Sequence, residues 1–352
     1  MAIQQIFMGY GKKVFNFTTP ALMNGSTGSY YISGVTVNSS GLFVAVGYQN
    51  SNNRAVYATS TDGSTWTTPA TIGTVYAHIQ RVAVNSSGLF VAVGAGTASS
   101  NDFPTCTTST DGSSWTTPIR INASSIPVSL PGIAVNSSGL FVAVGQNQGT
   151  ALGIYLTTSD GATWTGPTTM GSGFAAGMTG VTVNASGLFV AVGYGNSSLY
   201  PVYATSTNGT TWSTPAVMNG STTVARMFGV AVNSSGLFVA VGYNTLNYPV
   251  YATSTNGSTW TTPAVMNGST TVAYMQSIKV NSSGLFVAVG YDTSDRAVYA
   301  TSTDGSTWTT PALMNNSTTG ARMFSLAVNS SNLFAAVGYV YGSFNPVYAV
   351  GQ

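Results

Sequence analysis

One stretch of this chain decides its fold: Val232-Asn233-Ser234-Ser235-Gly236-Leu237-Phe238-Val239-Ala240-Val241-Gly242. Versions of this motif recur along the 352 residues, with the asparagine at positions 38, 85, 136, 184, 233, 281 and 329. The successive intervals are 47, 51, 48, 49, 48 and 48 residues. A near-constant period of this length is typical of an array of similar structural units. The sequence therefore predicts seven copies of one unit.

Each unit reads as four short strands, because helical periodicity is missing and β-branched and aromatic residues fill the apolar runs. In the fifth unit the predicted strands are 229–232, 237–241, 250–254 and 259–262. The second strand is apolar at consecutive positions, so both of its faces are expected to be buried. A blade packed between two neighbours explains this pattern better than a sandwich with one wet face. We predict an all-β fold, a seven-bladed β-propeller of four-stranded antiparallel blades.

The two ends of the chain predict how the ring closes. Residues 17–24, Phe-Thr-Thr-Pro-Ala-Leu-Met-Asn, match residues 308–315 in the seventh unit. The chain thus opens with a fourth strand and ends, at 346–352, with a third strand. The N-terminal strand is expected to complete the last blade and leave no open sheet edge there. We assign a single propeller domain to 12–352, preceded by a short segment, 1–11, that could anchor the chain.

The motif also predicts a tight turn. Asn-Ser-Ser-Gly fits a short hairpin whose glycine adopts the left-handed backbone conformation. In the seventh copy Asn332 replaces this glycine. Asparagine is the non-glycine residue that best tolerates positive φ, so the turn is expected to keep its shape.

A second motif lies between the third and fourth strands of each unit. It reads Ser60-Thr-Asp62-Gly-Ser-Thr-Trp66, and its relatives end at Trp115, Trp164, Trp212, Trp260 and Trp308, the remaining tryptophans of the chain. Asn208 and Asn256 replace the aspartate in two copies, and either side chain can accept hydrogen bonds from the N–H groups of the turn. We expect the tryptophans to pack between blades. The aspartates are expected to form turns rather than to catalyse or to bind metal.

This second motif resembles the Asp-box of the bacterial neuraminidase repeat family, which occurs in sialidases and in several non-enzymatic propellers. It is one residue shorter than the usual Ser-x-Asp-x-Gly-x-x-Trp. The resemblance raises the question of glycoside hydrolysis, but sialidases need a glutamate and this chain has none. Outside the boxes only Asp102, Asp292 and Asp295 remain, and the last two are too close in sequence to flank a scissile bond. We predict that the protein is not an enzyme.

Composition excludes several other classes. Charged residues make up 5% of the chain and the formal net charge is +2, so it has no basic field for nucleic acid. No apolar run approaches the length of a membrane span, about 20 residues, and 1–6 lacks the basic start of a signal peptide. One cysteine, Cys106, and one histidine, His78, leave no disulfide and no three-histidine zinc site. We expect no cofactor and no metal.

The predicted ligand site lies on the face of the loops. Loops between strands two and three, and between blades, vary among the copies, whereas the turns of the opposite face hardly change, and ligand sites favour variable loops on a rigid scaffold. Seven residues before each motif asparagine stand Tyr31, His78, Ser129, Gly177, Arg226, Tyr274 and Arg322, each followed by an apolar residue. We select Tyr31, His78, Arg226, Tyr274 and Arg322 as a ligand-binding arc around the channel mouth, because arginines beside aromatic rings suit a carboxylated or hydroxyl-rich ligand. The alternative is that these side chains plug the channel or bond neighbouring carbonyls.

The first thirteen residues, Met-Ala-Ile-Gln-Gln-Ile-Phe-Met-Gly-Tyr-Gly-Lys-Lys, are similar to the N-terminal stretches of tail and other virion proteins of bacteriophages. The leading hypothesis is a non-enzymatic phage virion component, on the virion surface or extracellular, that contacts host or environmental glycans beside other virion proteins. Two alternatives stay open. One is a bacterial lectin or adhesin whose repeated weak sites add avidity. The other is a structural propeller that binds proteins.

Overall fold

The computed structural model describes residues 15–98, 101–124, 126–171, 174–197, 199–220, 224–268 and 270–352. The described residues form seven four-stranded sheets, and every pairing between neighbouring strands is antiparallel. The predicted seven-bladed β-propeller of four-stranded blades is confirmed.

The first four blades, each from its inner to its outer strand, are built as follows. Blade 1 holds β2 (Tyr30–Val37), β3 (Phe43–Gln49), β4 (Arg54–Ser60) and β5 (Ala70–Tyr76). Blade 2 holds β6 (His78–Val84), β7 (Phe90–Ala98), β8 (Asn101–Ser109) and β9 (Ile119–Arg120). Blade 3 holds β10 (Val128–Val135), β11 (Phe141–Asn147), β12 (Gly153–Thr158) and β13 (Thr165–Thr169). Blade 4 holds β14 (Ala176–Val183), β15 (Phe189–Gly195), β16 (Pro201–Ser206) and β17 (Ala216–Val217).

The remaining blades follow the same order. Blade 5 holds β18 (Ala225–Val232), β19 (Phe238–Asn244), β20 (Pro249–Ser254) and β21 (Ala264–Val265). Blade 6 holds β22 (Ala273–Val280), β23 (Phe286–Asp292), β24 (Ala297–Ser302) and β25 (Ala312–Leu313). Blade 7 holds β26 (Ala321–Val328), β27 (Phe334–Val340), β28 (Pro346–Gly351) and β1 (Ala21–Leu22). Short 3-10 turns follow some outer strands: η1 (Met23–Gly25), η2 (Ile121–Ala123), η3 (Met218–Gly220), η4 (Met266–Gly268) and η5 (Met314–Asn316).

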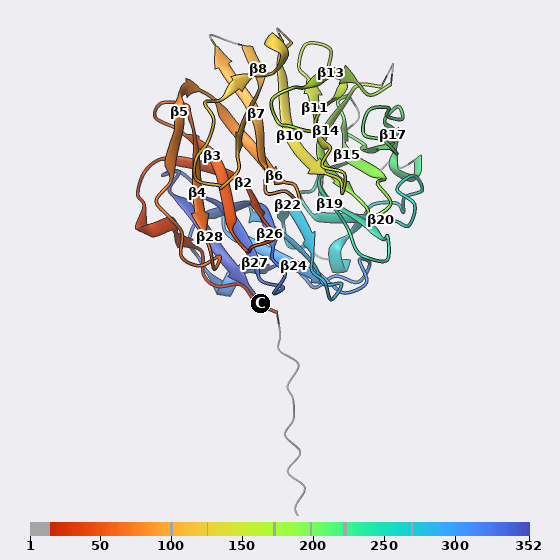
Figure 1. Cartoon of the computed structure of the whole chain (residues 1–352). Coiled ribbons are helices and arrows are strands. Elements are labelled where there is room, and N and C mark those ends of the chain that lie inside the picture. The colour runs from red at the N-terminus through yellow and green to blue at the C-terminus, as the bar shows by residue number, and fades with distance from the viewer. Residues whose placement is uncertain are drawn as a thin grey trace, which may run out of the picture.

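The blades are set radially. In Figure 1 the inner strands β2, β6, β22 and β26 gather near the middle of the view, and outer strands such as β5 and β17 lie at its rim. The second strand of each blade forms the core, because it is covered on both faces, as its apolar run predicted. Phe238, Val239 and Val241 of β19 are fully buried, and burying one such side chain contributes roughly 1.5–3 kcal/mol. The described helices are all too short to span a lipid bilayer.

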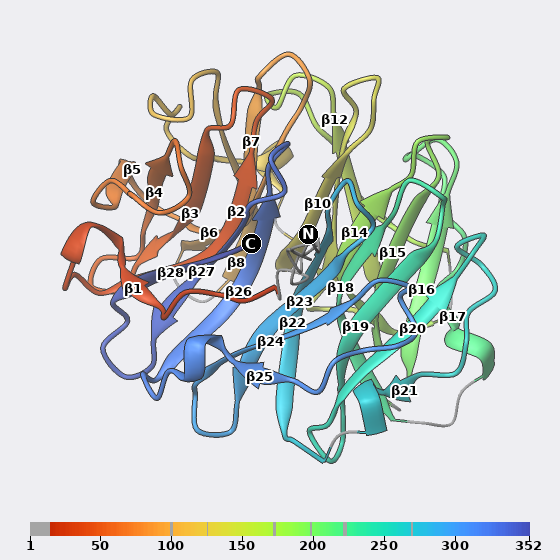
Figure 2. The same ribbon diagram turned by 90° about the horizontal axis from the view of Figure 1, so that it is seen from below.

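Strand β1 closes the ring. Figure 2 shows β1 beside β28, with β27 and β26 beyond it, and the sheet has the order β1-β28-β27-β26. Phe17 bridges to Gly351 just before β1, and its ring is buried with 2% of its surface exposed. The predicted closure by the N-terminal strand is therefore confirmed. The segment assigned to 1–11 lies outside the described residues, and its anchoring role stays a prediction.

The turn of the repeated motif has the predicted backbone. Asn38 accepts hydrogen bonds at Oδ1 from the N–H groups of Ser40 and Leu42, at 3.1 and 2.9 Å. Gly41 adopts a φ of 89°. Asn332, which replaces this glycine in blade 7, adopts a φ of 63°. The prediction that asparagine would preserve the turn is confirmed.

The aspartates and tryptophans of the second motif have structural roles, as predicted. Asp160 accepts hydrogen bonds from the N–H groups of Thr163 and Ala162, at 2.7 and 2.9 Å, and these bonds lower the pKa of its carboxyl group to about 2. Asn208 accepts the same two backbone bonds in its own turn. Trp66 is buried between Phe43 of its own blade and Tyr348 of blade 7. Trp115 is the exception among the tryptophans, because it is only half-buried.

The predicted outer strand of the fifth unit, 259–262, was wrong. The outer strand β21 begins only at Ala264, and Trp260 to Pro263 run outside any strand. Thr261 explains the shift: its N–H donates to Thr253 O, but the return bond from Thr253 N goes to the threonine hydroxyl instead of its carbonyl. The side chain replaces a ladder bond, so regular pairing starts later.

Candidate ligand-binding site on the loop face

The predicted arc residues stand at the start of the inner strands. Arg226 lies opposite Tyr243 in the pairing of β18 with β19, and Arg322 lies opposite Tyr339 in the pairing of β26 with β27. The apolar residue that follows is buried, as expected; Met227, for example, has no exposed surface. A register shift comes directly after it in six blades, and in blade 3 the shift spans Leu130 and Pro131. Such a bulge re-aims the next side chain, and Phe228 and Phe324 line the channel mouth.

Ten rings line this face in one unbroken series, which we call the aromatic arc. In order around the ring it comprises Tyr194, Phe228, Tyr243, Tyr274, Tyr291, Phe324, Tyr339, Tyr31, Tyr48 and His78. Centroids of successive rings are 3.9–6.2 Å apart. Most of these separations lie within about 4.5–7 Å, the range that aromatic pairs prefer, and two pairs, Tyr339 with Tyr31 and Tyr48 with His78, are closer. The arc runs from blade 4 through blade 7 to blade 2. Blade 3 interrupts it, where Gln146 donates to Asn196 at 2.8 Å.

Two of the five selected residues lie at the central mouth of the channel. Tyr31 and His78 line a cavity of about 400 Å³ together with Tyr48, whose ring stacks on the imidazole at 3.9 Å. His78 Nε2 lies 3.0 Å from Asn53 Oδ1, in the β3–β4 loop of the preceding blade. The mouth is therefore walled by rings that are fixed by their neighbours.

Arg226 and Tyr274 line a different cavity, which we call the side cavity. It has a volume of about 260 Å³ and lies between blades 4, 5 and 6. Its other lining residues are Leu199, Val224, Ala225, Tyr243, Asn244, Thr245 and Asn247. Arg226 lies 5.2 Å from the centroid of the Tyr194 ring and has no hydrogen bond or ion pair with any residue that the structure describes. The side cavity thus combines a free guanidinium, two phenols and two amides.

Arg322 is held in place instead of facing an open cavity. Its guanidinium pairs with Asp295 at 2.6 Å and lies over the rings of Tyr291 and Tyr341, 4.7 and 4.0 Å from their centroids. Burial alone would lower the pKa of Arg322, but the hydrogen bond to Asp295 and the charges of Tyr291, Tyr339 and Asp295 together raise it. The five selected residues are therefore split among two cavities and one ion pair, and only the rings of the arc connect them.

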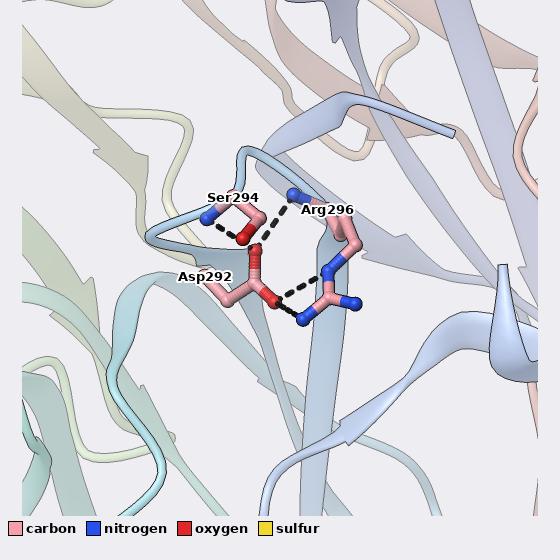
Figure 3. Close-up of polar contacts among 3 residues, drawn as sticks. All are labelled: Asp292, Ser294 and Arg296. Carbon is pink, nitrogen blue, oxygen red and sulfur yellow. Dashed lines mark hydrogen bonds and ion pairs between the residues drawn. The ribbon is translucent and has the colours of Figure 1, made fainter. Parts of the chain in front are cut away.

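The other aspartate of the same loop also has a structural role. Figure 3 shows the β23–β24 turn, where Asp292 accepts bonds from the N–H groups of Ser294 and Arg296, both at 2.9 Å. Its second oxygen pairs with the Arg296 guanidinium at 2.6 Å. Asp292 and Asp295 are thus each engaged by an arginine.

Sequence reasoning missed seven of the ten rings of the aromatic arc. Five of the missed rings lie one residue before the end of the second strands: Tyr48, Tyr194, Tyr243, Tyr291 and Tyr339. A signal for them was present, because each directly follows the glycine that closes the Val-Ala-Val-Gly run, which is Ala-Ala-Val-Gly in the seventh copy. Burial raises the pKa of Tyr291 to about 12, so the phenol of this residue stays a protonated hydrogen-bond donor over the physiological range. Among the described residues no cluster of three His, Cys, Asp or Glu side chains could hold a metal ion.

Comparisons with known proteins bear on the fold. No protein-family model matches the chain, and no curated protein does. Among solved structures it is similar to the BP39L lectin from Burkholderia pseudomallei, with a TM-score of 0.68 and 11% identity over 92% of this chain and 96% of that chain. It is also similar to YCF48 bound to D1 peptide, with a TM-score of 0.63 and 16% identity over 94% of both chains. A protein of unknown function from Dyadobacter fermentans gives a TM-score of 0.56 and 13% identity over 96% and 99% of the two chains.

At these identities the likeness shows the fold alone. The fold and the site define a class: a closed β-propeller of seven blades with an aromatic, arginine-bearing loop face. Membership of the Asp-box family stays a prediction.

Proposed function

We propose that this protein is a non-enzymatic recognition propeller that binds carbohydrate on its loop face, with the side cavity as its principal site. One observation carries the proposal. Arg226 lines that cavity beside Tyr243 and Tyr274, and no acidic side chain among the described residues neutralises it. A guanidinium with free donors beside ring faces is the combination that binds carboxylate and hydroxyl groups.

The size of the side cavity narrows the ligand. At about 260 Å³ it lies just below the range of pockets for drug-sized ligands, roughly 300–1,000 Å³, so it suits a single sugar ring. Asn244 and Asn247 line it, and amides hydrogen-bond sugar hydroxyls as both donors and acceptors. Because Arg226 adds a positive charge, we infer that an acidic sugar, carrying a carboxylate, binds more tightly than a neutral one.

The positions of the carboxyl groups favour binding over hydrolysis. Glycoside hydrolysis needs two carboxyl groups on opposite sides of one bond. Among the aspartates whose side chains the structure describes, Asp292 and Asp295 on the loop face are paired with Arg296 and Arg322, and Asp160 and its counterparts form turns on the opposite face. The protein is therefore proposed to hold its ligand without cleaving it.

A place on a bacteriophage virion is the setting that we propose for this binding. The N-terminal resemblance to virion proteins and the low charge content, 5% of residues, support it. The glycan would then belong to a host or environmental surface, and the partners would be other virion proteins. The lectin and the peptide-bound propeller among the similar structures are compatible with a binding role.

A glycan array that carries acidic and neutral sugars tests the proposal with three chains: wild type, Arg226→Ala and Arg322→Ala. The wild type is expected to bind glycans with exposed carboxylates, and Arg226→Ala is expected to lose at least tenfold in affinity. Arg322→Ala is the matched control, because its guanidinium is already paired with Asp295. Absence of binding by the wild type would refute carbohydrate recognition and favour the protein-binding scaffold, which a pulldown would then identify.

A further inference from the structure

The central channel carries two basic side chains, Arg81 and Lys279, in a lining that is otherwise uncharged. Its part nearer the motif turns is a cavity of about 340 Å³ walled by valine, alanine, isoleucine and threonine, and Lys279 is the one charged residue that lines it. Nearer the loop face lies a narrower cavity of about 80 Å³, which we call the neck, and both Arg81 and Lys279 line it. The residues lining the neck include no aspartate.

Arg81 is an exception among the copies. The residues equivalent to it, directly after the register shift of each inner strand, are Gly34, Gly132, Gly180, Gly229, Ser277 and Ser325. The strands are close together there: a Cβ built on Gly180 would lie 2.7 Å from Phe228 O. One blade thus places a guanidinium where the other six keep the channel open.

The two basic groups are only partly satisfied by the protein. Arg81 Nη1 donates to Ser33 O and Gln80 O, at 2.6 and 2.9 Å, and its other nitrogens have no partner among the described residues. Lys279 has no hydrogen bond or ion pair within the described ranges. Gln80, which lines the channel mouth beside Arg81, has a buried Oε1 without a partner. Gln80 belongs to the mouth, so the unpaired polar groups that line the neck itself are the donors of Arg81 and Lys279.

The two positive charges in the channel favour the binding of an anion. The Lys279 side chain is exposed to the space inside the channel, but seven blades surround it; desolvation by these surrounding atoms lowers the pKa of its ammonium, and the charge of Arg81 lowers it further. Burial also lowers the pKa of Arg81, to about 10. Two enclosed like charges are costly unless an opposite charge compensates them.

We propose that the channel neck binds one monovalent anion, a halide or a single small carboxylate, between Arg81 and Lys279. A volume of about 80 Å³ holds such an ion with a few waters, because one water needs only about 10–15 Å³ of this space. It excludes a sugar ring. The neck site is thus distinct from the side cavity and does not depend on the proposed carbohydrate function.

Crystals of the full chain grown in sodium bromide test the position of the ion. Anomalous diffraction is expected to show a bromide peak in the neck within contact distance of Arg81 and Lys279. A second experiment measures the Tm in solution while chloride or formate is exchanged stepwise for the bulky anion 2-(N-morpholino)ethanesulfonate at constant ionic strength. The Tm of the wild type is expected to rise by a few degrees as the small anion replaces the bulky one, because a ligand that binds only the folded state stabilises that state.

The variants are Lys279→Met and Arg81→Met, with Arg54→Gln of β4, outside the channel, as control. The concentration of chloride needed for the half-maximal rise in Tm is expected to increase more than tenfold in either channel variant and to stay unchanged in Arg54→Gln. Lys279→Met removes an uncompensated enclosed charge, so it is expected to fold at least as stably as the wild type in chloride-free buffer. A neck without bromide, or an equal response to chloride in wild type and channel variants, would overturn the proposal.

Discussion

Arg226 and Arg322 occupy equivalent positions in blades 5 and 7, yet the loop of the preceding blade places a different side chain beside each of them. In the loop before Arg322, Asp295 adopts a φ of 60° and pairs with the guanidinium at 2.6 Å. In the loop before Arg226, the equivalent residue is Leu199, with a φ of 53°, and its carbonyl accepts the N–H of Ala225 at 3.0 Å. Leucine has no acceptor to offer, so Arg226 keeps its charge for the side cavity.

The difference shows that the repeat determines where each of these side chains lies. The residue in the neighbouring loop determines whether the side chain is paired within the protein or available to a ligand. Other blades place Asn53 against His78 and leave Asn247 beside Tyr274. Because each pair crosses a blade boundary, two residues that are about 27 apart in sequence must be read together. Arg322 then forms an ion pair across the boundary between blades 6 and 7, and Arg226 is available to a ligand in the side cavity.

The largest expected effect comes from giving Arg226 the partner that Arg322 has. In Leu199→Asp the new carboxylate is expected to pair with Arg226 and to compete with an acidic ligand, which lowers affinity roughly tenfold or more, the value of about 1.5–3 kcal/mol for a charged hydrogen bond. The left-handed backbone at this position suits aspartate better than leucine, so stability should not fall. Isothermal titration with the best glycan of the array measures the change.

Leu199→Asn is the matched control for that variant. Asparagine has nearly the same shape and the same backbone tolerance but no charge, so affinity is expected to stay within about twofold of the wild type, below roughly 0.5 kcal/mol. Equal losses in Leu199→Asp and Leu199→Asn would mean that the leucine side chain itself contacts the ligand, which contradicts the electrostatic account.

The reverse change, Asp295→Asn, is expected to weaken the protein instead of its binding. The two side chains of this ion pair are 23% and 21% exposed, so losing the carboxylate charge should cost about 1 kcal/mol of unfolding free energy. Urea denaturation measures it as a lower midpoint with an unchanged slope. In 1 M salt the difference between wild type and variant should shrink, because ions screen the pair; a difference that does not respond to salt would point to packing.

The sequence predicted more of the propeller scaffold than of the candidate site. The seven blades, their closure at Phe17 and the left-handed turn at Asn332 follow from a motif repeated often enough to average out local exceptions. The prediction of an outer strand at 259–262 was wrong because a side-chain hydrogen bond of Thr261 replaces a backbone bond there. The strand propensities of the residues do not indicate such a replacement.

The site was only partly predictable for a different reason. A fixed spacing before each motif located Tyr31, His78, Arg226, Tyr274 and Arg322 at the start of the inner strands. Spacing within one repeat could not show that Asp295 captures Arg322, since that contact depends on how neighbouring blades meet. Nor could it show that Tyr243 and Tyr291 join the arc from the second strands.

The smallest expected effect concerns the ring beneath Arg226. Tyr194 holds its ring centroid 5.2 Å from the Arg226 guanidinium, whereas Arg322 has two rings at 4.7 and 4.0 Å. Tyr194→Leu removes one cation–π contact, worth about 0.5–1 kcal/mol, so affinity for the acidic glycan should fall two- to fivefold, roughly the same energy. Tyr194→Phe keeps the ring face and should bind like the wild type. If Tyr194→Phe loses as much as Tyr194→Leu, the phenol hydroxyl and not the ring supports the ligand, and Arg226 is positioned by other contacts.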